Sequence, residues 1–159
     1  MPAEKIAIFP GTFDPFTNGH LNIVNKSFRI FDKVIIAIGY NAAKKHLFAP
    51  EKRLDWIKEI FKNDSRVEAE IYTGVTYEYC TSRNAGFIIR GLRTSLDFEY
   101  EKQIAFVNEL LNNEILNVFL VSDQNYNSVS STIVRDLIIH KGDYSAFIPS
   151  QISNELINQ

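Results

Sequence analysis

Short runs of β-branched residues alternate along this chain with longer segments whose apolar residues recur at helical spacing. The run Val34–Ile38 contains no polar residue and is followed by Gly39, which is typical of a strand covered on both faces. Strands separated by helices need crossover connections, which favour a parallel sheet. The pattern therefore predicts an α/β fold: one Rossmann-like, doubly wound domain over residues 1–159, with a five-stranded parallel sheet and helices on both faces. The other expected strands are Ile6–Phe9, Val67–Tyr72, Phe87–Ile89 and Val118–Val121.

Local signals place the helices between these strands. Apolar residues over Asn22–Phe31 have helical spacing, and Pro50 fits the first turn of the next helix. Thr94 and Asp97 have the spacing of a capping box ahead of a helix that runs to about Leu111. Further helices are expected before Gly86, from Ser130 or Ser131 to near His140 with Gly142 as the stop signal, and after Pro149.

Composition excludes several classes of protein. The apolar fraction of 45% and charged fraction of 23% are those of a globular chain, and a net charge of −2 gives no support for a nucleic-acid surface. The N-terminus does not resemble a signal peptide, and no apolar run reaches the roughly 20 residues needed to cross a bilayer. The single cysteine, Cys80, suits a reducing compartment. We therefore expect a cytoplasmic protein that binds neither nucleic acid nor membrane.

In a doubly wound sheet, ligands bind beyond the carboxyl ends of the strands. Functional residues are therefore expected in the segments that directly follow the strands. These segments are Pro10–His20, Gly39–Phe48, Tyr72–Thr76, Arg90–Arg93 and Ser122–Ser131.

The segment Pro10–His20 has the strongest functional pattern. Its glycines, prolines and Asn-Gly pair predict a tight connection whose backbone can approach a ligand closely. Thr17 or Asn18 is a suitable N-cap, which places His20 in the first turn of a helix, where the N–H groups favour an anion. An isolated Gly-x-x-His would indicate only a turn, but its position at a strand–helix junction favours a phosphate site.

Two arginines follow the fourth expected strand, in the segment Arg90-Gly91-Leu92-Arg93. Guanidinium groups match the geometry of anionic oxygens, so this segment suits phosphate recognition. A solvated basic turn is the alternative, and the position at a strand end makes it the weaker one.

These motifs resemble those of the nucleotidyltransferase superfamily, which includes class I aminoacyl-tRNA synthetases, cytidylyltransferases and adenylyltransferases. Gly11–Pro15 with Thr17–His20 is similar to the T/HxGH signature of that superfamily. Ile89–Arg93 with Asp97–Glu101 resembles the bacterial phosphopantetheine adenylyltransferase family, and the resemblance covers essentially the whole chain. It implies transfer of AMP from ATP to 4′-phosphopantetheine, giving dephospho-CoA and pyrophosphate in coenzyme A biosynthesis. It also implies a homohexamer, built as a dimer of trimers, and coenzyme A as a candidate inhibitor.

The resemblance also implies roles for individual residues. The catalytic group would comprise His20 as transition-state stabiliser, with Lys44 and Arg90. Contacts to 4′-phosphopantetheine are implied for Thr12, Lys44, Val75, Thr76 and Arg90. Contacts to ATP are implied for Thr12, Phe13, His20, Gly91, Leu92, Arg93, Glu101, Tyr126, Asn127, Ser128, Val129, Ser130, Ser131 and Thr132.

Such a reaction needs no protein nucleophile, because the acceptor phosphate is itself an oxyanion. In-line attack on the α-phosphate brings two anions together, so catalysis depends on positioning and on stabilising the developing charge. Mg²⁺ carried by the ATP phosphates would neutralise the leaving pyrophosphate, and no protein ligand is assigned to it. Outside the motifs, we expect His46 and His140 to be exposed, Lys45 to be a solvated neighbour of Lys44, and Trp56 to pack in the core or an interface.

Two alternatives remain open. Another small nucleotidyltransferase, such as a cytidylyltransferase or a nicotinate-mononucleotide adenylyltransferase, is disfavoured by the Arg90–Arg93 segment. A non-catalytic nucleotide sensor on the same scaffold is disfavoured by the joint presence of Thr12, His20, Lys44 and Arg90.

Overall fold

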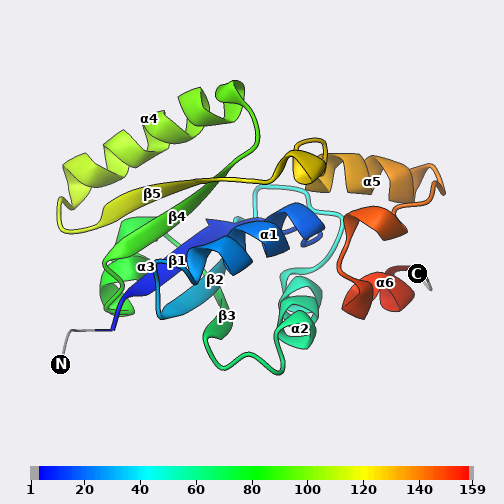
Figure 1. Cartoon of the computed structure of the whole chain (residues 1–159), viewed down its shortest axis with the longest axis horizontal. Coiled ribbons are helices and arrows are strands. Elements are labelled where there is room, and N and C mark those ends of the chain that lie inside the picture. Colours follow the sequence, from blue (N-terminus) through cyan, green and yellow to red (C-terminus); the bar gives the residue numbers. More distant parts are fainter. Residues whose placement is uncertain (1–3, 158–159) are drawn as a thin grey trace.

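A computed structural model describes residues 4–157 of the chain (Figure 1). Five strands form one sheet in the order β3-β2-β1-β4-β5, and every neighbouring pair is parallel. The predicted five-stranded parallel α/β architecture is therefore confirmed. The strands are β1 (Ile6–Gly11), β2 (Lys33–Gly39), β3 (Val67–Tyr72), β4 (Phe87–Leu92) and β5 (Leu116–Val121).

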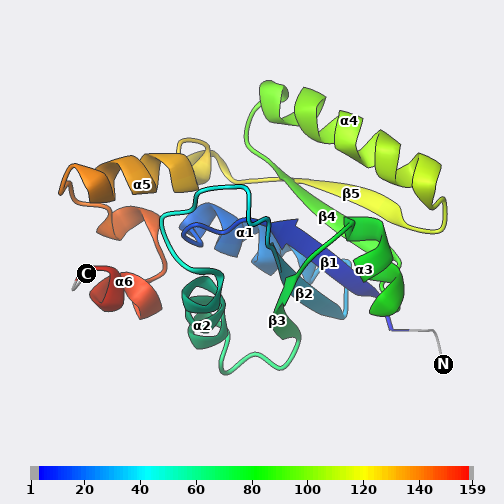
Figure 2. The ribbon, with the colours of Figure 1, turned by 180° about the vertical axis from the view of Figure 1, so that it is seen from behind.

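Helices cover both faces of the sheet (Figures 1 and 2). The helices α1 and α2 pack on one face together with residues of α5 and α6, and α3 packs on the other face. Helix α4 contacts α3 and the strands β4 and β5. The helices are α1 (Asn18–Ser27), α2 (Pro50–Ile60), α3 (Thr76–Ser82), α4 (Ser95–Leu111), α5 (Ser131–Ile139) and α6 (Ser150–Ile157), with short 3₁₀ turns η1 (Gln124–Tyr126) and η2 (Ser145–Phe147).

The sheet has an apolar core on each face, and the register of the central strands explains which residues belong to each core. Ile8 of β1 pairs with Ile35 of β2 on one side and with Ile88 of β4 on the other. These three side chains form one row and belong to the core beneath α3, whereas Val34 and Ile36 belong to the core beneath α1 and α2. Successive side chains of a strand point to opposite faces, so the apolar run of β2 fills both cores, as its composition predicts.

The chain winds outward from β1 in two directions, first to β2 and β3 and then to β4 and β5. The connections that leave β1 and β4 therefore diverge at the carboxyl edge of the sheet and leave a crevice there. This reversal of strand order fixes where the candidate site lies.

Several boundaries differ from the sequence-based expectation, and β1, β2 and β5 are each two residues longer than expected. Helix α1 ends at Ser27, so Phe31 is buried but lies beyond the helix. Strand β4 continues to Leu92, so Arg90 lies on the strand and not in a loop after it. Helix α5 ends near His140, as expected, but the residue with a positive φ, of 57°, is Lys141 and not Gly142.

The end of α5 is nevertheless a regular helix stop. Lys141 donates its N–H to the Ile138 carbonyl, and Gly142 donates to the Leu137 carbonyl at 2.8 Å, which is the Schellman pattern. A Cβ at Gly142 would lie 2.9 Å from the Leu137 side chain. Close packing therefore accounts for this glycine, while the left-handed position is occupied by a lysine.

The expected capping box of α4 is confirmed, with Thr94 and Asp97 bonded to each other's backbone N–H. Trp56 is buried as expected, and its indole N–H donates to Glu155 of α6. Cys80 is buried on α3, where burial raises the pKa of its thiol to about 11. Within residues 4–157, no helix has the length and apolar character needed to cross a membrane.

Candidate active site

A cavity of about 640 Å³ opens at the carboxyl edge of the sheet, between the ends of β1 and β4. Its walls come from four parts of the chain: the segment from β1 to α1, the loop from β2 to α2, the segment from β4 to α4, and the start of α5. Pockets of this volume hold small-molecule ligands. The cavity therefore lies at the crevice that the strand order predicts, and most of the motif residues line it.

His20 is held at this cavity by the start of α1. Thr17 is the N-cap, and its hydroxyl accepts a hydrogen bond from the His20 backbone N–H. In return, the Nδ1 atom of His20 accepts the backbone N–H of Thr17 at 3.0 Å. The histidine thus occupies the place that Glu or Gln takes in an ordinary capping box.

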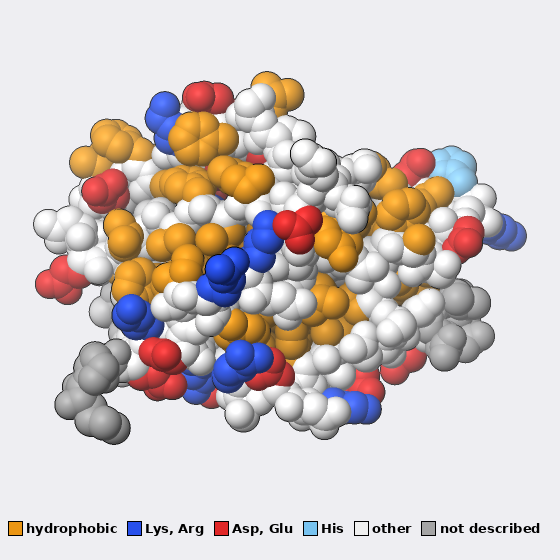
Figure 3. Space-filling view, viewed as in Figure 1, with side chains coloured by type: hydrophobic (Ala, Val, Ile, Leu, Met, Phe, Trp, Pro, Cys, Tyr) orange, Lys and Arg blue, Asp and Glu red, His pale blue; other side chains and the backbone are white. Residues whose placement is uncertain are grey.

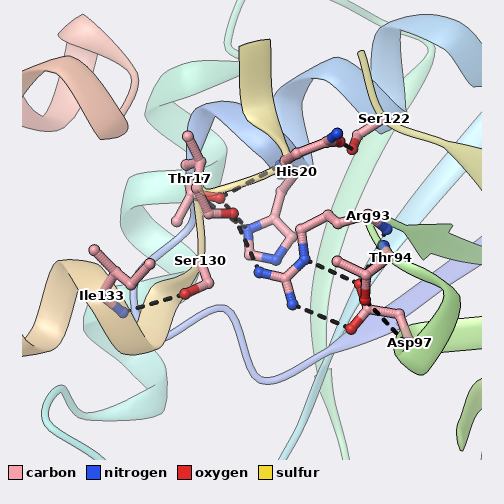
Figure 4. Close-up of polar contacts among 10 residues, drawn as sticks. Thr17, His20, Arg93, Thr94, Asp97, Ser122, Ser130 and Ile133 are labelled. Carbon is pink, nitrogen blue, oxygen red and sulfur yellow. Dashed lines mark hydrogen bonds and ion pairs between the residues drawn. The ribbon is translucent and has the colours of Figure 1, made fainter. Parts of the chain in front are cut away.

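This arrangement fixes the tautomer of His20. Because Nδ1 accepts a hydrogen bond from an amide, the proton of the neutral ring resides on Nε2. Two effects lower the pKa of His20 from 6.5 to about 3. The larger is desolvation by burial, and the smaller is the positive charge of Arg93. The ring is therefore a neutral Nε2–H donor at physiological pH, and the Arg93 guanidinium lies near it (Figure 4).

Aromatic rings enclose His20. The ring centroid of Phe13 lies 5.0 Å from that of His20, and the centroid of Phe16 lies 5.2 Å from it. Phe13 has a positive φ of 50°, an unfavourable conformation for a residue with a side chain. A Cβ at Gly11 would lie 2.7 Å from the Phe13 ring, so glycine at this position makes room for the ring.

Arg90 of β4 and Arg93, directly after this strand, line the cavity and have carboxylate partners. Arg90 donates to Glu101 of α4 at 3.1 Å, and its side chain is only 10% exposed. Arg93 donates through Nε to Asp97 at 3.3 Å and through Nη1 to the Val129 carbonyl at 3.3 Å. These partners hold both guanidinium groups in place beside the cavity.

Lys44 is exposed in the loop from β2 to α2 and lines two cavities. The second cavity, of about 310 Å³, also contains Thr76 and Arg90. The Thr76 hydroxyl lies 2.9 Å from the Tyr72 hydroxyl. Lys44 and Arg90 therefore lie where the two cavities meet.

The start of α5 forms the remaining wall. Ser130 is the N-cap and accepts the Ile133 N–H at 3.2 Å (Figure 4). Ser131 donates its hydroxyl to the Pro15 carbonyl at 2.8 Å, which ties α5 to the first loop. The cavity thus receives the positive N-terminal ends of two helices, α1 and α5, an arrangement that favours an anion.

The structure brings together most, but not all, of the residues singled out in the sequence. Leu92 is 8% exposed and points into the core, and Val75 is 44% exposed and lines neither cavity. Tyr126, Asn127 and Ser128, at and just after η1, also lie outside the lining of the two cavities. The residues that line at least one cavity are Thr12, Phe13, His20, Lys44, Thr76, Arg90, Gly91, Arg93, Glu101, Val129, Ser130, Ser131 and Thr132.

The expected exposure of His46 is wrong. Its side chain is 13% exposed, lines both cavities and places Nδ1 3.9 Å from a carboxylate oxygen of Asp14. His140 is exposed, as expected. The loop carrying His46 folds back onto the first loop, and this long-range contact has no signal in the local sequence.

Sequence reasoning also missed Arg135, which lines the cavity from α5. Its Nη1 atom donates to the Asp14 carbonyl at 2.8 Å. A single arginine within an amphipathic helix has no distinguishing spacing, so no pattern could have found it.

The chain resembles known proteins over most of its length. A family model described as cytidylyltransferase-like matches residues 8–137. A phosphopantetheine adenylyltransferase of Christiangramia forsetii is 45% identical over 148 residues, which cover 93% of this chain and 97% of that protein. One from Flavobacterium psychrophilum is 47% identical over 92% of this chain and 96% of that protein.

The chain belongs to the phosphopantetheine adenylyltransferase family. A member from Leptospira biflexa also matches it, with 38% identity over 98% of each chain. The matches to the phosphopantetheine adenylyltransferase family thus span the motifs at both ends of the sequence.

Solved structures share the fold at low sequence identity. A nicotinate-nucleotide adenylyltransferase from Vibrio parahaemolyticus, described as putative, superposes with a TM-score of 0.71 at 19% identity, covering 98% of this chain and 100% of that one. A bifunctional NMN adenylyltransferase/ADP-ribose pyrophosphatase from Francisella tularensis gives a TM-score of 0.73 at 17% identity, covering 98% of this chain and 49% of that one. The same protein has been solved with AMP and a manganese ion. The phosphopantetheine adenylyltransferase family thus shares its fold with other adenylyltransferases.

Proposed function

We propose that the protein transfers AMP from ATP to 4′-phosphopantetheine, which forms dephospho-CoA and pyrophosphate. The observation that carries this proposal is the convergence of His20, Lys44, Arg90 and Arg93, from three separate segments, on one cavity. Two phosphorylated substrates repel each other, and cations and hydrogen-bond donors at fixed positions reduce that repulsion. The names of the relatives supply the identity of the acceptor.

In the proposed reaction, an oxygen of the acceptor phosphate attacks the α-phosphorus of ATP in line with the leaving group. A new P–O bond forms, the bond between the α-phosphorus and the bridging oxygen breaks, and pyrophosphate departs with the electron pair. No proton is removed from the attacking group. The charge that develops on the α-phosphate oxygens is therefore the quantity that the protein stabilises.

The residues divide between the two substrates. His20 donates a hydrogen bond from its Nε2–H group to an α-phosphate oxygen. Lys44 and Arg90 bind the acceptor phosphate where the two cavities meet. Thr12 contacts the phosphates of both substrates, and Thr76 lines the smaller cavity, which receives the pantetheine arm. ATP lies in the larger cavity against Phe13, Gly91, Arg93, Glu101, Val129, Ser130, Ser131 and Thr132.

Mg²⁺ fits this donor set as a companion of ATP. The cavity carboxylates Asp97 and Glu101 are engaged with arginines, and both oxygens of Asp14 accept backbone N–H groups, so phosphate oxygens and water are the available ligands. When bound, the ion would neutralise charge on the leaving pyrophosphate.

The decisive experiment is a pyrophosphate-release assay on the purified protein, with ATP or CTP as donor and 4′-phosphopantetheine or nicotinamide mononucleotide as acceptor. We expect turnover only with ATP and 4′-phosphopantetheine, in the presence of Mg²⁺, and inhibition by coenzyme A, which shares both halves of the product. A preference for CTP or for the mononucleotide would replace this proposal by the corresponding rival activity. ATP binding without any turnover would support the alternative of a non-catalytic nucleotide sensor.

We place the reaction in the cytoplasm, where ATP is produced and a buried free thiol such as Cys80 stays reduced.

We further propose that the protein assembles as a homohexamer, a dimer of trimers. Helix α4 supports self-association because it carries a row of large exposed apolar side chains, visible in the upper part of Figure 3. Leu96 is 81% exposed, Leu110 is 72% exposed and Phe106 is 61% exposed. Exposed apolar surface of this kind marks an interaction site. Sedimentation equilibrium should give six times the chain mass, and Leu110→Lys should shift it to smaller species, whereas a monomeric wild type would reject the assembly.

A further inference from the structure

Two buried charged side chains, Asp14 in the cavity wall and Arg53 on α2, touch the backbone of the loops that bind phosphate in the proposed reaction. Asp14 is 2% exposed and Arg53 is 0% exposed. We propose that Asp14 and Arg53 form a clamp that positions Lys44 relative to Thr12. This inference rests on the proposed function, because it assigns the clamp its purpose through Lys44.

Asp14 holds the end of the lysine loop. Its two carboxylate oxygens accept the backbone N–H groups of Leu47 at 2.8 Å and Phe48 at 3.0 Å. The same carboxylate lies 3.9 Å from the His46 ring. Three successive residues of the loop are therefore gathered around one side chain of the first loop, and hydrogen bonds to a carboxylate are stronger than neutral ones.

Arg53 also holds both loops. It lies on α2, and its Nε atom donates to the Phe48 carbonyl at 3.0 Å, while Nη1 donates to the Thr12 carbonyl at 2.5 Å. Burial lowers the pKa of the guanidinium, and the neighbouring Asp14 and Glu51 raise it. An arginine side chain remains protonated at physiological pH, so Arg53 carries a full positive charge.

These contacts matter because the loop is otherwise exposed. Residues 40–45 are all exposed, and the local backbone bond of Lys44 is one N–H to the Asn41 carbonyl at 3.0 Å. Asp14 and Arg53 fix the carboxyl end of the loop at residues 46–48, which lie two to four residues after Lys44. Buried charges are expensive to desolvate, and an apolar residue would fill the inner face of α2 equally well. We therefore infer that Arg53 fixes the position of the loop from β2 to α2 relative to the loop from β1 to α1.

The test is a double-mutant cycle between the clamp and the lysine. Asp14→Asn retains the shape of the side chain but presents an NH₂ group to one of the two N–H donors. We expect kcat/KM for 4′-phosphopantetheine to fall by about 10- to 100-fold, because a misplaced catalytic group loses this much. In a Lys44→Ala background the same substitution should add less than about threefold, because it acts through Lys44. Asp136→Asn on the exposed face of α5 is the matched control and should leave the rate unchanged.

A merely structural role for Asp14 would give the full loss in both backgrounds and would overturn the inference. Arg53→Lys provides a second variant, since it keeps the charge but reaches only one of the two carbonyls, with Arg66→Lys as its control. We expect Arg53→Lys to behave as Asp14→Asn does in the cycle.

Limited trypsin digestion gives a readout that does not depend on activity. Loss of the clamp should release the loop, so cleavage after Lys44 and Lys45 should accelerate several-fold in Asp14→Asn and Arg53→Lys, with overall melting still far above the digestion temperature. Unchanged cleavage would overturn the clamp, even if both variants lose activity. Absence of wild-type turnover would instead reject the proposed function, and the digestion would still test the clamp.

Discussion

The unusual environment of His20 predicts a pH dependence of stability that one substitution should remove. The folded protein lowers the pKa of His20 from 6.5 to about 3, so the unfolded state binds a proton at this residue several pH units before the folded state does. The stabilisation is complete above pH 6.5 and is lost as the pH falls from 6.5 toward 3. Between pH 7.5 and pH 5.0 the loss from this single group amounts to about 2 kcal/mol.

The matched variant is His20→Gln. Glutamine is the usual partner of a threonine N-cap at this position, so it can accept the Thr17 N–H as Nδ1 does, but it does not titrate. Urea unfolding of both proteins at pH 7.5 and pH 5.0, at one protein concentration, gives four free energies of unfolding. We expect the wild type to lose about 2 kcal/mol more than the variant over this interval.

The other titrating groups are common to both proteins and cancel in the comparison. Equal losses in the two proteins would show that His20 protonates in the folded state near its ordinary pKa. The neutral Nε2–H donor, and with it the assignment of this donor to the α-phosphate, would then be wrong.

Other predictions follow from single contacts. His20→Ala should lower kcat by several hundredfold in the pyrophosphate-release assay and leave the circular dichroism spectrum unchanged, because a phosphate donor is lost while the core is intact; near-normal turnover would remove His20 from the mechanism. Lys141→Gly should raise the free energy of unfolding by about 1 kcal/mol, since it relieves the left-handed conformation at the end of α5, and a decrease in urea unfolding would contradict this reading. Thr94→Ala removes the N-cap of α4 and should lower that free energy by about 1 kcal/mol, whereas Thr73→Ala, at an exposed position just after β3, is a surface control.

Much of the fold was predictable because its signals are local. The apolar run of β2, the capping box at Thr94 and Asp97, and the alternation of strands with helices each depend on neighbouring residues. The edge of the sheet that carries the cavity followed from the topology alone. The extension of β4 was missed because Arg90 and Gly91 are poor strand residues by composition, and pairing with β5 holds them in the sheet.

The candidate site was predictable only in part. Motif residues such as His20 and Arg90 could be predicted because their motifs lie at or just after the carboxyl ends of strands. The burial of His46 and the contacts of Asp14 and Arg53 depend on the way two loops fold against each other. A buried arginine within α2 has the same local sequence pattern as an exposed one, so its role becomes visible only when its partners are known.

The central claim is that one cavity brings the phosphates of both substrates under the same set of donors. A crystal structure of the protein with dephospho-CoA tests it directly, because this product carries both phosphates joined in one diphosphate. We predict that an oxygen of the diphosphate lies about 3 Å from Nε2 of His20, with Lys44 and Arg90 on the pantetheine side. A diphosphate bound away from His20, or a pantetheine arm that leaves the cavity on the side opposite Thr76, would contradict the account.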